Sequence, residues 1–437
     1  MKILFFADNF WPERNAQASR VYERARYWVR WGHEVTVITC APNFPEGKVF
    51  EGYENRWRQV ETIDGIRVVR VKTFLARNEG RYQRMADFVS FLPAAFLASC
   101  AEGRPDVVGA TSPQVFAALA GWLGSVWHGR PFLLELSDLW PASIAAVGAL
   151  KPGLVMRVLG GLEMFLYGRA TVIAAQTEAF RRDLVERGVG AAKVAVVLNG
   201  VELEMYSPSL RDAELAAEWG LPGGELVVGY IGTLGMAHGL MGVLEAAEAM
   251  RGERVRFLLV GPGAEREMLM AEAARRGLDN VTFIGSQPKA MMRRVWSLVD
   301  VALVHLKDTP VFKTVIPSKI FEAMASGKPV LLAAPEGEAS ELVRGAGAGV
   351  HTGSGNAEGL IALSRALAGD PAGREAMAAS ALRAAPNYSR ERQARAFMDL
   401  FGGLTDEQKE DSVGGGSAAE FHEVGPAVVG VGERGGV

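Results

Sequence analysis

The 437-residue sequence has little cysteine and little histidine. Its two cysteines, Cys40 and Cys100, exclude a disulfide scaffold and a cysteine-rich zinc site, and they are compatible with a reducing cytosol. The six histidines are scattered, and no pair of them has the spacing of metal ligands. We therefore expect no protein-held metal.

Long hydrophobic runs and an excess of charge are also missing. No charge-free apolar stretch is as long as the roughly 18 residues that a membrane-spanning helix needs, and the longest candidate, 88–100, is interrupted by Pro93. We expect no secretory signal, because Lys2 is followed only by the short run 3–7 and then by Asp8. A net charge of −3 argues against a nucleic-acid-binding surface. These absences predict a cytoplasmic protein without a nucleic-acid partner.

What is present is an alternation of short apolar runs with longer amphipathic segments. Hydrophobic residues make up 49% of the chain, enough for a large core, and the length predicts about two to four domains. Expected strands lie at 3–7, 34–40, 66–71, 106–110, 132–136, 171–175 and 194–198. After a turn-rich segment at 218–224, further strands are expected at 226–231, 256–260, 281–284, 301–304 and 330–332.

This alternation predicts an α/β protein with two Rossmann-like domains that face each other across a cleft. We assign residues 1–205 to the first domain, 206–224 to a linker and 225–386 to the second domain. Residues 387–403 predict an amphipathic helix that packs back on the first domain. Residues 404–437 turn charged and then glycine-rich, which predicts a disordered tail.

The most informative segment is 317–329, with the sequence PSKIFEAMASGKP. Pro317 suits a helix entry and Ser318 can cap it. The free N–H groups of the first turn would then attract a phosphate, and Lys319 adds a cation there. Glu322, about one turn further on, can accept hydrogen bonds from ribose hydroxyls. The alternative is an ordinary capped helix with a solvated lysine and glutamate.

Two glycine-rich turns follow expected strands of the second half. The first contains Gly232 and Gly235, and the second contains Gly261 and Gly263. A strand followed by glycines lets the backbone approach phosphates closely. The spacing is not the G-x-G-x-x-G of dinucleotide sites, so that class is not supported. Plain strand-to-helix turns are the alternative.

Two loops of the first half follow strands at the same expected sheet edge. One is 8–20, and the other, 135–141, carries Asp138. We expect Asp138 to face the cleft as a base or a substrate hydrogen-bonding group; a helix or turn cap is the alternative. The sequence contains no Ser-His-Asp order, nucleophile elbow, P-loop or H-E-x-x-H motif.

Several segments together resemble the GT-B glycosyltransferases of family 4. They are GHEVTVIT at 32–39, LNGVE at 198–202, the glycine loop at 232–239, VGPG at 260–263 and the segment 317–329. They occur in the family's order and span about residues 1–402. PNFPEGK at 42–48 with Gly52-Tyr53, DLWP at 138–141 and PSK at 317–319 resemble the branch that includes L-fucosamine transferases of surface-polysaccharide assembly.

The resemblance implies retaining transfer of a sugar from a nucleotide-sugar, usually UDP-linked, without a metal or other cofactor. The donor would bind the second domain and a glycan or lipid-linked acceptor the first. Lys319 and Asp138 are the catalytic candidates. Donor-binding candidates are Gly232, Thr233, Gly235, His238, Gly261, Gly263, Lys313, Ser318 and Glu322. Acceptor-side candidates are Asn15, Ser19, Arg20 and Trp140.

The sequence departs from the family's pattern at three positions. Thr314 stands where the first glutamate of Glu-x7-Glu is usual, and Thr233 and His238 stand in place of an arginine and a lysine. We expect Lys319 to replace the missing cations, with Lys313 and Lys307 behind it. The missing glutamate suggests a different sugar, such as an N-acetylated or deoxy one, or else lost activity.

Basic residues beside two apolar segments predict peripheral contact with an anionic membrane. Arg77, Arg81 and Arg84 precede 88–100, and Lys151, Arg157 and Arg169 flank or interrupt 154–167. Buried helices with snorkelling arginines are the alternative. Two other functions are also compatible with the sequence. One is a nucleotide-sugar 2-epimerase, and the other is a non-catalytic sugar-nucleotide-binding subunit of an assembly complex.

Overall fold

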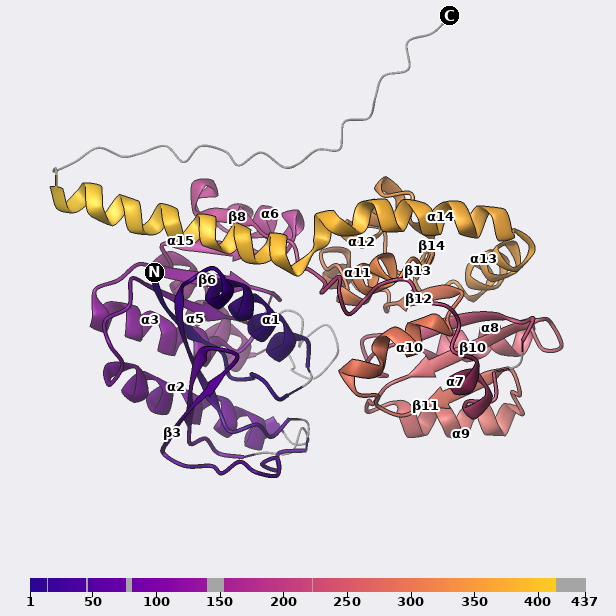
Figure 1. Ribbon diagram of the computed structural model, residues 1–437, viewed down its shortest axis with the longest axis horizontal. Coiled ribbons are helices and arrows are strands. Elements are labelled where there is room, and N and C mark those ends of the chain that lie inside the picture. The colour runs from indigo at the N-terminus through magenta and orange to yellow at the C-terminus, as the bar shows by residue number, and fades with distance from the viewer. Residues whose placement is uncertain (14, 45, 76–80, 140–152, 222, 414–437) are drawn as a thin grey trace, which may run out of the picture.

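The computed structural model describes residues 1–413 apart from 14, 45, 76–80, 140–152 and 222. The chain forms two α/β domains that lie side by side, with the first in indigo to magenta and the second in pink to orange (Figure 1). Helix α15, Arg390–Val413, leaves the second domain and lies along the first.

The first domain is built on an eight-stranded sheet in the order β3-β4-β2-β1-β5-β6-β7-β8. All neighbouring strands are parallel except β3 and β4. The strands are β1 Lys2–Phe6, β2 Glu34–Cys40, β3 Arg58–Ile63, β4 Ile66–Val71, β5 Val107–Thr111, β6 Phe132–Leu136, β7 Val172–Ala175 and β8 Val194–Val196. The helices are α1 Ala16–Arg30, α2 Arg81–Cys100, α3 Val115–His128, α5 Leu154–Arg169 and α6 Glu178–Glu186.

The central strand β1 shows how this sheet is buried on both faces. Leu4 and Phe6 point into a core shared with α2 and α3. Ile3 and Phe5 point the other way, into a core with Trp28 of α1 and with α15. Successive strand residues face opposite sides of a sheet, so a run that is apolar at every position fits a sheet covered by helices on both faces.

The second domain is built on a six-stranded parallel sheet in the order β11-β10-β9-β12-β13-β14. Its strands are β9 Leu226–Ile231, β10 Val255–Val260, β11 Val281–Ile284, β12 Val301–His305, β13 Val330–Ala333 and β14 Gly349–Thr352. Its helices are α7 Ala213–Glu218, α8 Met241–Ala249, α9 Arg266–Arg276, α10 Met292–Ser297, α11 Ser318–Ala325, α12 Glu338–Gly345, α13 Ala357–Gly369 and α14 Pro371–Ala384.

Every strand expected from the sequence is present, and two further strands were not predicted. Strand β3 lies at the sheet edge, is mostly polar and alternates exposed with half-buried residues, unlike the mainly apolar runs of the interior. Strand β14 is also an edge strand, and its four residues include a glycine and a histidine. Edge strands bury less apolar surface, so their sequences carry a weaker signal.

The chain crosses between the domains near residue 200 and returns near residue 389. The two crossings pair, because Val201 donates its N–H to Tyr388 O at 2.9 Å and Arg390 donates its N–H to Val201 O at 2.8 Å. Gly200 allows this approach, since a Cβ there would lie 2.8 Å from Ser389 O. Helix α15 then packs on α1, where Trp28 Nε1 donates to Ala394 O at 3.0 Å.

The C-terminal end of the last helix differs from the predicted one. Helix α15 continues past residue 403 to Val413, so the segment from 404 to 413 is helical and the predicted tail begins too early. Residues 414–437 of that tail lie outside the described residues.

Among the helices that the structure describes, none is long and apolar enough to cross a membrane.

Candidate functional site

Loops at the carboxyl ends of both sheets meet between the domains. Thr177 follows β7 and donates its Oγ1 hydrogen to Thr314 O, which follows β12, at 2.8 Å. Glu338, after β13, accepts from the Ala179 N–H at 2.6 Å. Lys289, after β11, contacts Glu23 of α1. The carboxyl edges of the two sheets therefore face each other, which is where ligands of such sheets bind.

The two glycine turns of the second domain pack directly on each other. The Leu234 N–H donates to Pro262 O at 2.7 Å. A Cβ on Gly261 would lie 2.1 Å from Gly232 O, and a Cβ on Gly263 would lie 2.1 Å from Leu234 O. The lack of side chains at Gly261 and Gly263 is thus explained by contact between the turns. The loop beside α11 is the one that carries Gly232.

Lys319 is a buried cation on the first turn of α11. Among the described residues, its Nζ has no hydrogen-bond partner. Nζ lies 3.7 Å from the centroid of the Tyr230 ring, and a Cβ on Gly232 would lie only 3.0 Å from it. Burial lowers the pKa of Lys319 to about 7, against the opposing effect of Glu322. The site therefore holds a poorly solvated ammonium group that an anion would stabilise.

Neither histidine beside Lys319 replaces the missing cations. His238 Nδ1 faces His305 O at 3.3 Å, and His305 Nδ1 faces His238 O at 2.6 Å. Each ring thus donates its Nδ1 hydrogen to the other residue's carbonyl group. Burial, together with the charge of Lys319, lowers the pKa of His238 to about 3, and burial lowers that of His305. Both rings are neutral near pH 7.

The N-terminus of α11 has no side-chain cap. The prediction that Ser318 caps this helix is wrong, because Pro317 occupies the N-cap position and Ser318 is the first helical residue. Proline offers no side-chain acceptor, so the N-cap residue makes no side-chain hydrogen bond to the N–H groups of the first turn. An uncapped N-terminus beside a buried ammonium group is a favourable place for a phosphate.

Glu322 lies on the same helix, one turn after Ser318. The pKa of Glu322 is raised to about 6, chiefly by burial and also by the charge of Glu23, while the charges of Lys289, Lys319 and Arg390 lower it. Charges from both domains therefore act on this half-buried residue.

The two other candidate cations, Lys313 and Lys307, are less favourably placed than Lys319 to bind a phosphate. Lys313 is exposed in the short helix η3, Pro310–Lys313, and Lys307 Nζ lies 4.0 Å from Glu265. Thr233 is exposed, and its carbonyl group accepts from the Tyr230 hydroxyl at 2.7 Å. Gly235 is half-buried in the same loop. Lys319 is therefore the strongest phosphate-binding candidate of the set.

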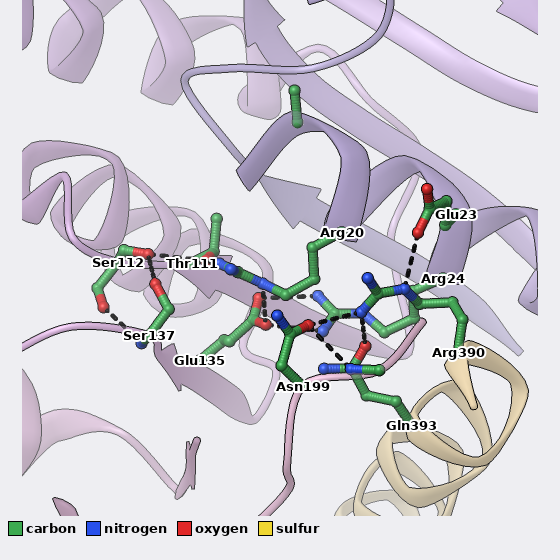
Figure 2. Close-up of polar contacts among 12 residues, drawn as sticks. Arg20, Glu23, Arg24, Thr111, Ser112, Glu135, Ser137, Asn199, Arg390 and Gln393 are labelled. Atoms are coloured by element: carbon green, nitrogen blue, oxygen red, sulfur yellow. Dashed lines mark hydrogen bonds and ion pairs between the residues drawn. The ribbon is translucent and has the colours of Figure 1, made fainter. Parts of the chain in front are cut away.

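Arg20, predicted on the acceptor side, belongs to a buried ion cluster of the first domain (Figure 2). Its Nε donates to Glu135 Oε1 at 2.9 Å, and its Nη2 donates to Thr111 Oγ1 at 3.2 Å. Arg24 donates two bonds of 2.8 Å to the same carboxylate. These arginines hold the pKa of Glu135 at about 2, against the effect of burial. With a side chain only 5% exposed, Arg20 is placed to hold the framework.

The remaining first-domain candidates are spread over α1 and the edge near β6. Asn15 caps α1 by accepting from the Ala18 N–H at 2.8 Å, so the helix begins within the segment 8–20 that was predicted as a loop. Ser19 is half-buried within that helix. Asp138 is half-buried and lines a cavity of the first domain together with Glu163. Trp140 lies outside the described residues.

A buried carboxylate that sequence reasoning missed organises the loop after β1. Glu13 accepts the N–H groups of Asn43 and Phe44, both at 2.8 Å, and that of Phe10 at 3.3 Å. Burial raises its pKa to about 7. Glu13 thereby fastens the segment after β2 to the segment after β1. Its signal in the sequence was only a charged residue directly after Pro12.

Side chains that gather at a sheet edge can also bind a metal ion. Within the part of the chain that the structure describes, no three His, Cys, Asp or Glu side chains gather closely enough to hold a metal ion.

Solved structures of other proteins share the fold of this chain. Sucrose-phosphate synthase from Thermosynechococcus elongatus superposes with a TM-score of 0.75 at 18% identity, covering 93% of this chain and 99% of that one. Anabaena HepE in complex with UDP-glucose superposes with a TM-score of 0.69 at 19% identity, covering 92% of this chain and 100% of that one. The fold is GT-B, with two Rossmann-like domains.

Family models cover both domains. Residues 15–200 match the glycosyl transferase 4-like domain, and residues 212–383 match the glycosyl transferases group 1. The chain is therefore a glycosyltransferase that joins a family 4-like domain to a group 1 domain.

Curated relatives agree with this assignment. One is the putative colanic acid biosynthesis glycosyl transferase WcaI of Escherichia coli (strain K12), 27% identical over 75% of this chain and 82% of that protein. Another is the putative teichuronic acid biosynthesis glycosyltransferase TuaH of Bacillus subtilis (strain 168), 27% identical over 68% of this chain and 72% of that protein. The names of both relatives place them in the synthesis of cell-surface polysaccharides.

The unpaired charge of Lys319 predicts a gain in stability on its removal. Its pKa falls from 10.5 to about 7 on folding, so the unfolded chain binds more protons between these values. The free-energy cost of burying the charged ammonium group is full below pH 7, and it decreases as the pH rises toward 10.5. Lys319→Met should raise the free energy of unfolding by about 1–3 kcal/mol at pH 7, and by less at pH 9.5.

Guanidinium unfolding of the ligand-free protein measures this difference. Lys313→Met, which removes an exposed lysine from the same region, should leave the stability within about 0.5 kcal/mol of the wild type. A loss of stability in Lys319→Met would contradict a strained, unpaired ammonium group.

Proposed function

We propose that the protein is a retaining, metal-independent glycosyltransferase of surface-polysaccharide synthesis. It would transfer a sugar from a UDP-linked donor to a glycan or lipid-linked acceptor. The observation that carries the proposal is the buried ammonium of Lys319, unpartnered among the described residues, between the Gly232 loop and the uncapped N-terminus of α11. This arrangement favours an anionic ligand, and a nucleotide-sugar brings a diphosphate.

In this mechanism the second domain stabilises the leaving group. The bond between the anomeric carbon and the β-phosphate oxygen breaks, and the acceptor oxygen bonds to that carbon on the same face. The acceptor proton passes to the departing phosphate oxygen. Charge develops on the diphosphate as it leaves, so a dry, fixed ammonium and aligned N–H groups lower the barrier. Lys319 and the first turn of α11 are assigned this role.

The other groups of the second domain bind the rest of the donor. Glu322, as a carboxylate, would accept hydrogen bonds from the two ribose hydroxyls. Thr314 supplies no charge to the donor sugar, and its hydroxyl donates to Val311 O at 2.7 Å. A neutral side chain here supports a deoxy or N-acetylated sugar, in line with the resemblance to L-fucosamine transferases. Asp138 is the first-domain candidate for contact with the acceptor.

The test is a thermal-shift panel of UDP, GDP, ADP, dTDP and their sugars, with and without magnesium. A selective rise in melting temperature with UDP ligands, unaffected by magnesium, is expected. Lys319→Met should reduce that rise and lower turnover by about 10- to 1000-fold, whereas Lys2→Met, at a 58% exposed lysine that begins β1, should do neither. Donor conversion without an acceptor would instead indicate an epimerase, and binding without turnover would indicate a non-catalytic subunit.

The affinity for the donor should depend on pH in two directions. Glu322, with a pKa of about 6, must be ionised to accept ribose hydroxyls, so binding weakens as the pH falls below 6. Lys319, with a pKa of about 7, must be protonated to bind the diphosphate, so binding weakens as the pH rises above 7. Calorimetric titration from pH 5 to 9 should give the tightest binding between these values, and a flat profile would contradict both assignments.

Helix α5 supports peripheral contact with a membrane. Leu154, Val155 and Val158 are exposed by 72%, 53% and 60%, so the alternative of a fully buried helix does not hold for this end of α5. Arg157 lies among them and can interact with lipid phosphates. Of the other basic residues in this prediction, Arg77 and Lys151 lie outside the described residues.

Flotation with vesicles tests this contact. The wild type should bind vesicles that contain phosphatidylglycerol at low salt and should not bind neutral phosphatidylcholine vesicles. Leu154→Asp should abolish binding, because it puts a negative charge into the apolar patch. The matched control is Leu210→Asp, at a side chain 95% exposed in the linker between the domains. Equal binding by both variants would overturn the role of α5.

A further inference from the structure

Four neighbouring strands of the first sheet each have an exposed aromatic side chain at the same edge. Trp11 follows β1, Phe44 follows β2 and Phe74 follows β4. Strand β3 is antiparallel to β4, so Trp57, which directly precedes β3, lies at this edge as well. The sheet order β3-β4-β2-β1 therefore places the four side chains along one edge as an aromatic row, in the order Trp57, Phe74, Phe44 and Trp11.

The aromatic row is open to solvent, and its length suits a chain of sugars. From Trp11 to Trp57 in sheet order, the four side chains are 36%, 38%, 51% and 77% exposed. Neighbouring strands are about 4.8 Å apart, so four strand ends span about 14 Å. One sugar ring of an extended glycan covers a length similar to one strand spacing. The row therefore matches about three or four successive sugar residues.

Two buried charged residues fix the inner end of the row. The Glu13 carboxylate accepts the Phe44 N–H at 2.8 Å. Arg70, 1% exposed, donates from Nη2 to Trp11 O at 2.6 Å. The Trp11 ring stacks on the Tyr22 ring of α1, with centroids 4.8 Å apart. An exposed ring on a fixed backbone loses little conformational entropy when a ligand binds to it.

Neutral polar groups fix the outer end of the row. The Phe74 N–H donates to Ser90 Oγ of α2 at 2.8 Å. Thr73 and Asn55 form two hydrogen bonds, because Asn55 Nδ2 donates to Thr73 O at 2.8 Å and the Thr73 N–H donates to Asn55 Oδ1 at 3.1 Å. These bonds tie the segment that follows β4 to the segment that leads into Trp57.

The surroundings of the row favour a sugar chain over a lipid surface. A pyranose ring presents C–H groups on its faces and hydroxyls at its rim, so it suits an aromatic face with polar groups beside it. Lys72 Nζ, 4.9 Å from the centroid of the Trp57 ring, can donate to such a hydroxyl. The loop that ends at Trp57 exposes acidic as well as basic side chains, and an anionic membrane would repel Glu46, Glu51 and Glu54.

We propose that the aromatic row binds successive sugar residues of the acceptor, which is a glycan at least three residues long. The proposal rests on the proposed function, in which a sugar is transferred to a glycan. Strand β1 leads into α1, and α1 contacts the second domain through Glu23. Trp11 therefore marks the end of the row nearer the donor, and Trp57 marks the far end. The acceptor specificity is thus for a growing chain.

The experiment measures dissociation constants by calorimetry, with UDP present. The probes are oligosaccharides of one to six residues, prepared from the surface polysaccharide of the cell that makes the protein. Wild-type affinity should rise with length up to about four residues and then level off. Trp57→Ala should weaken binding of the hexasaccharide about five- to tenfold and flatten the dependence on length. Trp57→Phe, which keeps an aromatic face, should bind like the wild type, whereas Trp57→Leu should bind like Trp57→Ala.

Trp127→Ala is the matched control, because Trp127 is a tryptophan of α3 that is 62% exposed and lies away from this edge. It should bind every oligosaccharide like the wild type. Wild-type affinity that does not change with length, or wild-type binding of the hexasaccharide by both Trp57→Ala and Phe74→Ala, would overturn the proposal. So would a loss of vesicle binding in Trp57→Ala without a loss of oligosaccharide binding, because the row would then contact a membrane.

Failure of the proposed function gives a different result. A protein that binds the oligosaccharides in this way but binds no sugar nucleotide would overturn the proposed function and leave the aromatic row as a glycan site. A protein that binds UDP ligands but none of the oligosaccharides would overturn the role of the row alone.

Discussion

The chain passes between its domains twice, and Arg390 holds the two passages against helix α1. Its N–H pairs with Val201, its Nη1 donates to Asn199 Oδ1 at 2.7 Å, and its Nε donates to Glu23. Because both crossings are fixed to one helix of the first domain, the carboxyl edges of the two sheets come to face each other. Every contact described between the domains, including that of Thr177 with Thr314, depends on this arrangement.

The second domain buries the ammonium group of Lys319, which has no hydrogen-bond partner among the described residues. Lys319 lies between an aromatic ring and a glycine loop, and both neighbouring histidines direct their Nδ1 hydrogens to each other's carbonyl groups. Folding thus accepts a desolvated ammonium group that a bound diphosphate would stabilise. Sites that bind anions commonly sacrifice stability in this way, since preorganised charge is useful only when the ligand arrives.

The sequence predicted the fold well because most residues of the interior strands are apolar and their helices are regular. It missed β3 and β14, whose edge positions demand less burial. It identified the segment that carries Lys319 and Glu322, because both lie on one short helix with a clear entry. It could not assemble Glu23, Lys289 and Arg390, since these residues are far apart in the chain and meet only through the domain arrangement.

Arg20 and the glycines at 261 and 263 have structural partners that the sequence did not indicate. Arg20 follows the first strand at the expected sheet edge, but spacing alone cannot show that Glu135 and Thr111 already occupy its guanidinium group. The glycines at 261 and 263 looked like phosphate-binding positions, yet their Cβ positions are filled by the backbone of the neighbouring loop. In both cases a partner distant in the sequence decides the role, and local pattern carries no information about it.

The central claim is that Lys319 and the first turn of α11 form the diphosphate site. A crystal structure with UDP bound tests it most directly. The account predicts a phosphate oxygen within hydrogen-bonding distance of Lys319 Nζ and of a backbone N–H at the start of α11, with Glu322 on the ribose. A nucleotide bound elsewhere, with Lys319 still packed on Tyr230 and without an anionic partner, would contradict it.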